Sequence, residues 1–178
     1  MLPYLALFSL LLANNPSVTM AQEGEGIPQN IYGEPLQQCS QPGMALTGYT
    51  RNGHCQDYPG DHGSHHVCVD IAGTTGGNFC TVTGQPNWCN RNMPCTEDAS
   101  KQCPIQNWCV CEWAFSSYIQ KAGGCDKIAH IQCDAINQKT LFAYEQATMR
   151  GNEKARQALA CIKSRCHLEG HEETSDAL

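Results

Sequence analysis

Alternating hydrophobic and polar positions predict several short strands in this chain. Residues 65–71 show the pattern most clearly, because Val67, Val69 and Ile71 fall on one side of an extended segment. The other side of that segment carries His66, Cys68 and Asp70. We expect further strands at residues 44–50, 107–111 and 127–133, and a short one at residues 79–82.

A different spacing, in which apolar residues recur every three or four positions, predicts helices in the second half of the chain. They are expected at residues 112–124, 134–150 and 153–166. Asp134 can cap the second helix, and Gly151 separates it from the third. Short strands interleaved with helices indicate an α+β domain, with a small mixed β-sheet and two or three C-terminal helices.

The chain begins with an apolar run, residues 5–13, that is too short to span a bilayer. Small residues follow it, so we expect a secretory signal peptide at residues 1–21, cleaved between Ala21 and Gln22. Residues 22–43 show no helical or strand period and are predicted to form an extended N-terminal arm. A single domain at residues 44–166 and a flexible acidic tail at residues 167–178 complete the expected organisation.

All 13 cysteines lie in the part that remains after this cleavage. An exported chain with so many cysteines is expected to be stapled by disulfides, because secretory and extracellular compartments are oxidising. Since 13 is an odd number, at least one thiol must stay free, bind a metal or pair with another chain. Residues 84–104 contain three cysteines and no periodic pattern, so we expect disulfides to fix this loop.

The formal net charge of −6 argues against two classes of partner. Nucleic acid binding requires a basic surface that neutralises phosphates, and attraction to anionic lipid also requires positive charge on the protein. No segment after the signal peptide is apolar enough to span a membrane. We therefore expect a secreted protein whose partner is a small ligand or an extracellular protein.

Residues 61–68, DHGSHHVC, combine side chains that bind metals or activate nucleophiles. Neutral imidazole and thiolate are ligands that zinc prefers, and catalytic zinc sites use three of them with one open position. His65 and Cys68, joined by Cys109 or Cys111 from the neighbouring strand, could supply such a zinc site.

Asp61 would orient His65 in this arrangement by accepting a hydrogen bond from its ring. If the segment is a strand, however, His66 rather than His65 shares a face with Cys68, and both histidines stay candidates. Thiol chemistry is a second hypothesis, because Cys111 lies directly before an expected helix, whose N-terminus favours a thiolate.

Three segments, LTGYTRNGHC, PGDHGSHHVC and NWCVCEW, together resemble a small bacterial group, domain-of-unknown-function family 2237. The resemblance runs from about residue 46 to residue 144. Position by position, it points to Arg51, Gly53 and Cys55, to Asp61, Gly63, His65, Val67 and Cys68, and to Trp108, Cys109 and Cys111. It implies candidate positions and no reaction, because no activity is established for the family.

The chain departs from the family pattern at two places. Ala114 and Phe115 stand where the pattern has Arg-Trp, and Asn137 stands where it has a histidine. If that histidine transfers a proton in the relatives, Asn137 cannot do the same.

The family's bacterial members resemble cytosolic proteins, in which lasting disulfides are rare. The resemblance therefore implies that Cys55, Cys68, Cys109 and Cys111 are not obligate bridges. The disulfide candidates are then Cys39, Cys80, Cys89, Cys95, Cys103, Cys125, Cys133, Cys161 and Cys166. Cys161 and Cys166 lie on different faces of one expected helix, so we expect each of them to bond to a distant partner.

Two functions follow as alternatives. The first is a secreted, disulfide-stapled domain with a concave site for a small ligand or a metal. Its expected site residues are Arg51, Cys55, Asp61, His65, Cys68, Trp108, Cys109 and Cys111. The second is a structural or protein-interaction module, in which the cysteine-rich loop at residues 84–104 forms the binding surface.

Overall fold

The structure is a computed structural model, and it describes residues 27–73 and 77–168. The predicted signal peptide and the predicted tail from residue 169 onward lie outside the described residues. No helix in the described ranges is both long enough and apolar enough to cross a membrane.

Two short strands form the central ladder of the fold. β1 (Val67–Asp70) pairs antiparallel with β4 (Asn107–Val110), and Cys68 lies directly opposite Cys109. The predicted alternation in β1 is confirmed: Val67 and Val69 belong to the main apolar core, whereas Cys68 belongs to a smaller separate cluster. Both sides of β1 are therefore buried.

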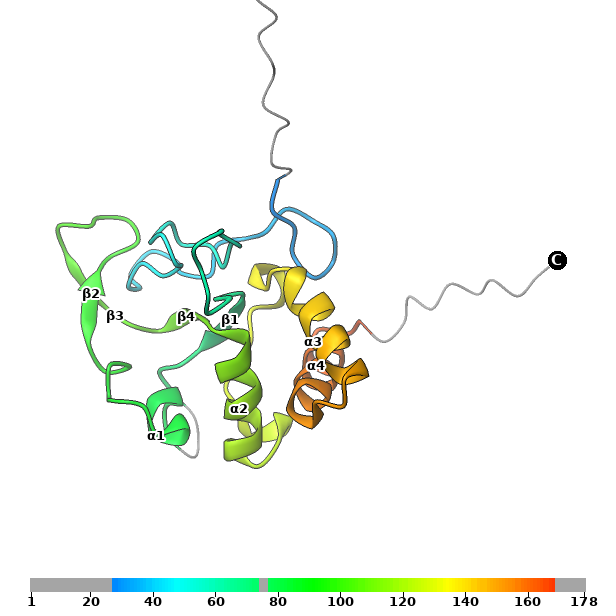
Figure 1. The fold of residues 1–178 in the computed structure, drawn as a ribbon. Coiled ribbons are helices and arrows are strands. Elements are labelled where there is room, and N and C mark those ends of the chain that lie inside the picture. Colours follow the sequence, from blue (N-terminus) through cyan, green and yellow to red (C-terminus); the bar gives the residue numbers. More distant parts are fainter. Residues whose placement is uncertain (1–26, 74–76, 169–178) are drawn as a thin grey trace, which may run out of the picture.

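A second antiparallel pair lies apart from the ladder. β2 (Asn92–Pro94) and β3 (Gln102–Pro104) form a hairpin within the predicted cysteine-rich loop, and the Cys95–Cys103 disulfide closes it. Figure 1 shows this hairpin at the edge of the molecule, away from the three long helices.

Three helices pack together beside the ladder: α2 (Glu112–Ala122), α3 (Lys139–Met149) and α4 (Glu153–Arg165). α2 ends where Gly123 takes a φ of 89°, a left-handed conformation that suits glycine. α4 begins at Asn152, whose side chain accepts a hydrogen bond from the Ala155 amide. The predicted C-terminal helices are thus confirmed, and the domain is α+β.

Four predicted elements need correction, and two of them are helical in the structure. Residues 79–82 are not a strand but part of a short helix, α1 (Phe79–Thr83), because Asn78 caps its first turn and Phe79 packs edge-on against Tyr118 of α2. The helix predicted from residue 134 begins only at Lys139, after a short 3₁₀ turn, η2 (Cys133–Ala135).

The strands predicted at residues 44–50 and 127–133 are reduced to single bridges, Ala45 to Cys95 and Ile131 to Val69. A 3₁₀ turn, η1 (Cys125–Lys127), occupies the start of the second segment. Without these strands the described residues form two antiparallel pairs in place of one mixed sheet.

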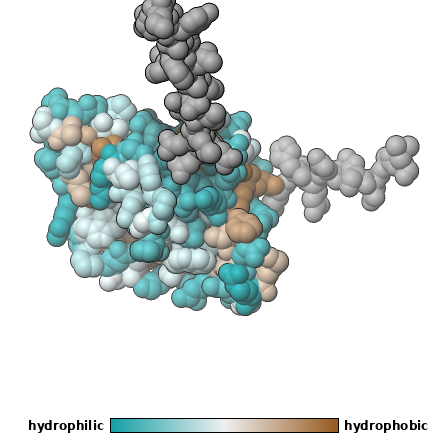
Figure 2. All heavy atoms as spheres, turned by 45° about the horizontal axis from the view of Figure 1, so that its top comes forward, coloured by the Kyte–Doolittle hydropathy of each residue, from teal (hydrophilic) through white to brown (hydrophobic). Residues whose placement is uncertain are grey.

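The described arm residues from 27 to 43 cross the top of the molecule in Figure 1, beside the start of α3. A bridge between Asn30 and Asn137 joins the two segments, and Cys39 ties the arm to β1 by a disulfide. The face that Figure 2 presents is largely hydrophilic, with an apolar area at one side. Phe142 and Met149 of α3 are among the exposed large hydrophobic residues.

Candidate functional site

Six disulfides fix the chain, and every one of the nine predicted disulfide cysteines takes part in one. The pairs are Cys39–Cys68, Cys55–Cys109, Cys80–Cys89, Cys95–Cys103, Cys125–Cys161 and Cys133–Cys166. Cys161 and Cys166 bond to distant partners, as expected. Cys111 is the remaining free thiol, and it is partly exposed.

The predicted division of the cysteines into two sets needs correction. Cys55, Cys68 and Cys109 were expected to stay outside the disulfides, yet all three are bonded. Cys39 of the arm supplies a partner for Cys68, and the fold brings Cys55 and Cys109 together although they are 54 positions apart in the sequence.

The predicted zinc ligands do not fit a metal in this structure. The sulfurs of Cys68 and Cys109 are consumed in disulfides, so neither is available as a thiolate, the form that binds zinc. His65 is not part of either His/Cys/Asp/Glu group that is close enough to hold an ion among the described residues. Each of those two groups contains a bonded cysteine pair.

The structure does bring His65 and Asp61 together. His65 Nδ1 lies 2.6 Å from Asp61 Oδ1, and the His65 amide donates to Asp61 Oδ2 at 2.8 Å. The ring also passes so close to Gly63 that a Cβ there would lie 2.5 Å from His65 Cε1. Glycine at position 63 therefore permits the contact, and the ring of His65 faces Tyr49 at a centroid distance of 6.3 Å.

Burial acts to raise the pKa of Asp61, but hydrogen bonds outweigh it. The His65 amide and ring and the Gly63 amide all donate to this carboxylate, and together they hold its pKa below the usual value. The Asp61 side chain is fully buried, whereas 37% of the His65 side chain is exposed. His65 is thus an oriented imidazole at the surface, as the sequence suggested.

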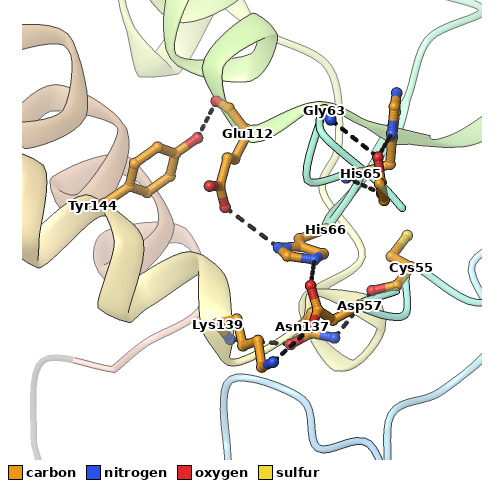
Figure 3. A network of polar contacts seen from close by, with 10 residues as sticks. Cys55, Asp57, Gly63, His65, His66, Glu112, Asn137, Lys139 and Tyr144 are labelled. Carbon is orange, nitrogen blue, oxygen red and sulfur yellow. Dashed lines mark hydrogen bonds and ion pairs between the residues drawn. The ribbon is translucent and has the colours of Figure 1, made fainter. Parts of the chain in front are cut away.

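The neighbouring histidine, His66, is almost fully buried between two carboxylates (Figure 3). Its Nε2 lies 3.1 Å from Asp57 Oδ1, and its Nδ1 lies 3.4 Å from Glu112 Oε2. Neither Nδ1 of His66 nor Oε2 of Glu112 makes a hydrogen bond of good geometry to another described group. His66 therefore links Glu112 of α2 to Asp57, which follows Cys55 in the chain.

Glu112 is held in place by the helices. It opens α2 and is buried, and its backbone carbonyl accepts a hydrogen bond from the Tyr144 hydroxyl of α3. Burial, followed by the charges of Glu112 and Cys111, raises the pKa of Tyr144 well above its usual value, so the hydroxyl stays a donor.

Asp57 links this buried pair to the surface. Its second oxygen accepts a hydrogen bond of 2.6 Å from Lys139 Nζ at the start of α3. The Lys139 hydrogen bond and charge, together with His66, lower the pKa of Asp57 against a smaller opposing effect of burial. Sequence reasoning missed Asp57, His66 and Glu112 as a group; the only signal was the alternation that placed His66 beside Cys68.

A pocket of about 580 Å³ opens at this point. Its described lining is Ile27, Pro28, Gln29, Gln56, Asp57, Asn137, Gln138 and Lys139. Four of these residues carry neutral amides, two are apolar, and Asp57 and Lys139 form one pair of opposite charges. None of the eight site residues expected from the sequence lines it.

A family model described as an uncharacterized protein conserved in bacteria, DUF2237, matches residues 29–152. The chain belongs to this family. The predicted resemblance is thereby confirmed, and no curated protein matches the chain significantly.

Asn137, which stands where the sequence resemblance led us to expect a histidine, is part of the pocket lining. Asn137 is buried there, where its Nδ2 donates to the Cys55 carbonyl at 3.2 Å and its Oδ1 accepts from the Lys139 amide at 3.0 Å. The asparagine thus holds the loop after Cys55 against the start of α3. It positions Asp57 and Lys139 and has no proton to transfer.

Two other motif residues, Arg51 and Trp108, pack against each other. Arg51 takes a φ of 56° and lies over the Trp108 ring, with Cζ 4.9 Å from its centroid. Trp108 in turn contacts Trp88. Trp108, Cys68 and Cys109 are buried, so they do not line an open site of the kind expected from the sequence.

Proposed function

We propose that this protein is a secreted, disulfide-stabilised domain that binds a small zwitterionic molecule, such as a free amino acid, in the pocket beside Asp57 and Lys139. Secretion is supported by the N-terminal sequence and by the pairing of all cysteines but Cys111. The binding proposal depends on one observation, the Asp57–Lys139 ion pair at the pocket wall.

The chemistry of the lining favours a ligand with both signs of charge. Asp57 can accept from an ammonium group, and Lys139 can donate to a carboxylate. The amides of Gln29, Gln56 and Gln138 offer neutral donors and acceptors around them. A volume of about 580 Å³ falls in the range of small-ligand pockets, which is roughly 300–1,000 Å³.

His66 contacts both Asp57 at the pocket wall and the buried Glu112. Asp57 is held from two directions, by His66 and by Lys139, which keeps its carboxylate at the pocket wall. A polar group fixed before binding loses less freedom when the ligand arrives. His66 is therefore a positioning residue for Asp57.

Isothermal titration calorimetry with free L-amino acids tests the proposal. The wild-type protein should bind at least one of them, and Asp57→Asn should weaken binding about tenfold or more, because the amide cannot pair with an ammonium group. Lys139→Met should weaken it similarly. Simple sugars and molecules with a single charge serve as comparison ligands.

Asp126→Asn is the matched control, since Asp126 pairs with Lys127 on the exposed turn η1 and is not in the pocket lining. It should bind as the wild type does. If no amino acid binds, or if Asp57→Asn binds as tightly as the wild type, the proposed function is wrong. The alternative of a protein-interaction module at residues 84–104 stays a prediction.

A further inference from the structure

A second cavity, of about 360 Å³, adjoins the candidate pocket. Its described lining is Ile27, Pro28, Leu36, Asn52, His54 and Gln56. Ile27, Pro28 and Gln56 also line the candidate pocket, so the two cavities have half of this lining in common. We call the second cavity the side cavity. A molecule bound beside Asp57 and Lys139 can therefore extend past the shared residues into it.

The arm folds back on itself and builds one wall of the side cavity. The Leu36 amide donates to the Pro28 carbonyl at 2.8 Å, and Asn30 holds the turn between them, because its side-chain oxygen accepts from two amides of that turn. The same arm is fixed to the start of α3, where the Gln138 amide donates to the Gln29 carbonyl at 3.1 Å. One folded segment thus contributes to both cavities.

Residues 52–56 supply the rest of the lining of the side cavity. The Tyr58 hydroxyl donates to Gln56 Oε1 at 3.2 Å and accepts from Asn52 Nδ2 at 3.0 Å. His54 Nδ1 lies 3.0 Å from the Asn52 carbonyl oxygen. These contacts hold the wall in place before a ligand arrives, which lowers the entropic cost of binding.

The two cavities differ in the chemistry of their linings. The candidate pocket contains Asp57 and Lys139, whereas the described lining of the side cavity contains no Asp, Glu, Lys or Arg. Half of that lining is apolar, and Ile27 is 75% exposed. A ligand that covers this apolar surface removes it from water, which favours binding. A charged group in the side cavity would lose water without gaining a partner of opposite charge.

A third cavity, of about 380 Å³, does not offer the same extension. Its described lining is mainly polar, with four glutamines and Asp134, and it has no residue in common with the candidate pocket. It shares His54 with the side cavity. The side cavity is therefore the better candidate for the part of a ligand that lies beyond Asp57 and Lys139.

We propose that the side cavity is an apolar subsite, so that the protein selects amino acids with a large apolar side chain, such as leucine. The ammonium and carboxylate groups of the ligand lie at Asp57 and Lys139, and Ile27 and Leu36 determine specificity by contacting its side chain. This inference rests on the proposed function and names the class of amino acid that the site binds.

Isothermal titration calorimetry of the wild-type protein with glycine, L-leucine and L-aspartate measures this selectivity. L-leucine should bind at least about tenfold more tightly than glycine, because each methylene buried against apolar surface increases affinity roughly fourfold. L-aspartate has a side chain of similar shape, but its charge has no partner in the described lining of the side cavity. It should bind more weakly than L-leucine by at least about tenfold.

Two substitutions remove apolar surface from the side cavity. Ile27→Ser and Leu36→Ala should each lower the ratio of leucine affinity to glycine affinity at least about fivefold. Leu36 is buried, so urea unfolding must show that Leu36→Ala still folds; Ile27 is exposed, and Ile27→Ser carries the test if it does not. Met149→Ser is the matched control, because Met149 is 71% exposed and lines none of the three cavities. It should keep the wild-type ratio.

Asp57→Asn separates this inference from the proposed function. It should weaken the binding of glycine and of L-leucine by similar factors, because both ligands carry the same ammonium group. If glycine and L-leucine bind equally tightly to the wild type, or if Ile27→Ser keeps the wild-type ratio, the side cavity does not select the side chain and this inference alone is overturned. If no amino acid binds, the proposed function and this inference are both wrong.

Discussion

Two regions of this molecule reach stability by different routes. The first, which we call the loop layer, is residues 27–66 and contains no helix or strand. The second, the helical half, consists of α2, α3 and α4. The loop layer has only a few buried apolar side chains, and the disulfides of Cys39 and Cys55 tie it to the ladder. The helical half packs Phe115, Tyr118 and Ile162 into the main core.

The difference shows that disulfide bonds stabilise the region in which burial of apolar side chains is limited. Where apolar residues recur with a helical period, burial of their surface stabilises the segment. Where they do not, disulfide bonds stabilise the segment by reducing the conformational entropy of the unfolded chain. The candidate pocket lies where these regions meet, since Asp57 comes from the loop layer and Lys139 from α3.

Removing the bond between Cys55 and Cys109 should have the largest effect. These residues are 54 positions apart, and the chain-entropy model gives a loop of that length about 4 kcal/mol. The double variant Cys55→Ala/Cys109→Ala should lose about that free energy of unfolding, measured with urea. Cys95→Ala/Cys103→Ala, which opens a separation of only 8 residues, should lose about 2.5 kcal/mol. Equal losses would contradict the idea that long-range bonds hold the loop layer.

The helical half should respond to a cavity. Ile162 of α4 is fully buried in the main core, so Ile162→Ala removes apolar contacts and leaves a void that costs about 3 kcal/mol of unfolding free energy. Met149→Ala at the exposed end of α3 is the control, with an expected change below about 0.5 kcal/mol. Thermal unfolding of both variants measures the difference. A small effect of Ile162→Ala would show that disulfides dominate this half as well.

The same contrast explains how much the sequence predicts. α2 and α4 carry regular apolar stripes and recognisable ends, and their predicted bounds agree with the structure within a few residues. Residues 44–50 and 127–133 also have strand-forming composition, but each makes only one bridge. Whether a strand grows depends on a partner segment, and that information is not local.

In the candidate site, too, contacts between residues that are close in the sequence are predictable and contacts between distant residues are not. The Asp61–His65 contact spans four residues and could be inferred from a short motif. The group formed by Asp57, His66 and Glu112 joins a loop, the residue before β1 and the start of α2, so no local spacing predicts it. Disulfide pairing is nonlocal in the same way, which is why the roles of Cys55, Cys68 and Cys109 were predicted wrongly.

Within the loop layer, Asp61 should make stability depend on pH. Its pKa is lowered in the folded state, so its contribution is fully present above the unfolded value near 3.8 and is lost as the pH falls through the folded value. Asp61→Asn should therefore cost about 2 kcal/mol near pH 6 and less near pH 3, measured by urea unfolding. Asp126→Asn, at an exposed carboxylate, is the control and should change little. A loss that is the same at both pH values would refute the role of the ionised carboxylate.

The smallest effect should come from the helix caps, which compare α4 of the helical half with α1, a short helix that a disulfide also restrains. Asn152 accepts a hydrogen bond from the Ala155 amide at the start of α4, a helix of 13 residues. Asn152→Ala should cost about 1 kcal/mol, because the amide loses its acceptor. Asn78 caps α1 in the same way, but α1 has only 5 residues and the adjacent Cys80–Cys89 bond also restrains it. We therefore expect Asn78→Ala to lower the free energy of unfolding by less than Asn152→Ala in urea titrations. The reverse order would show that a covalent restraint does not replace a cap.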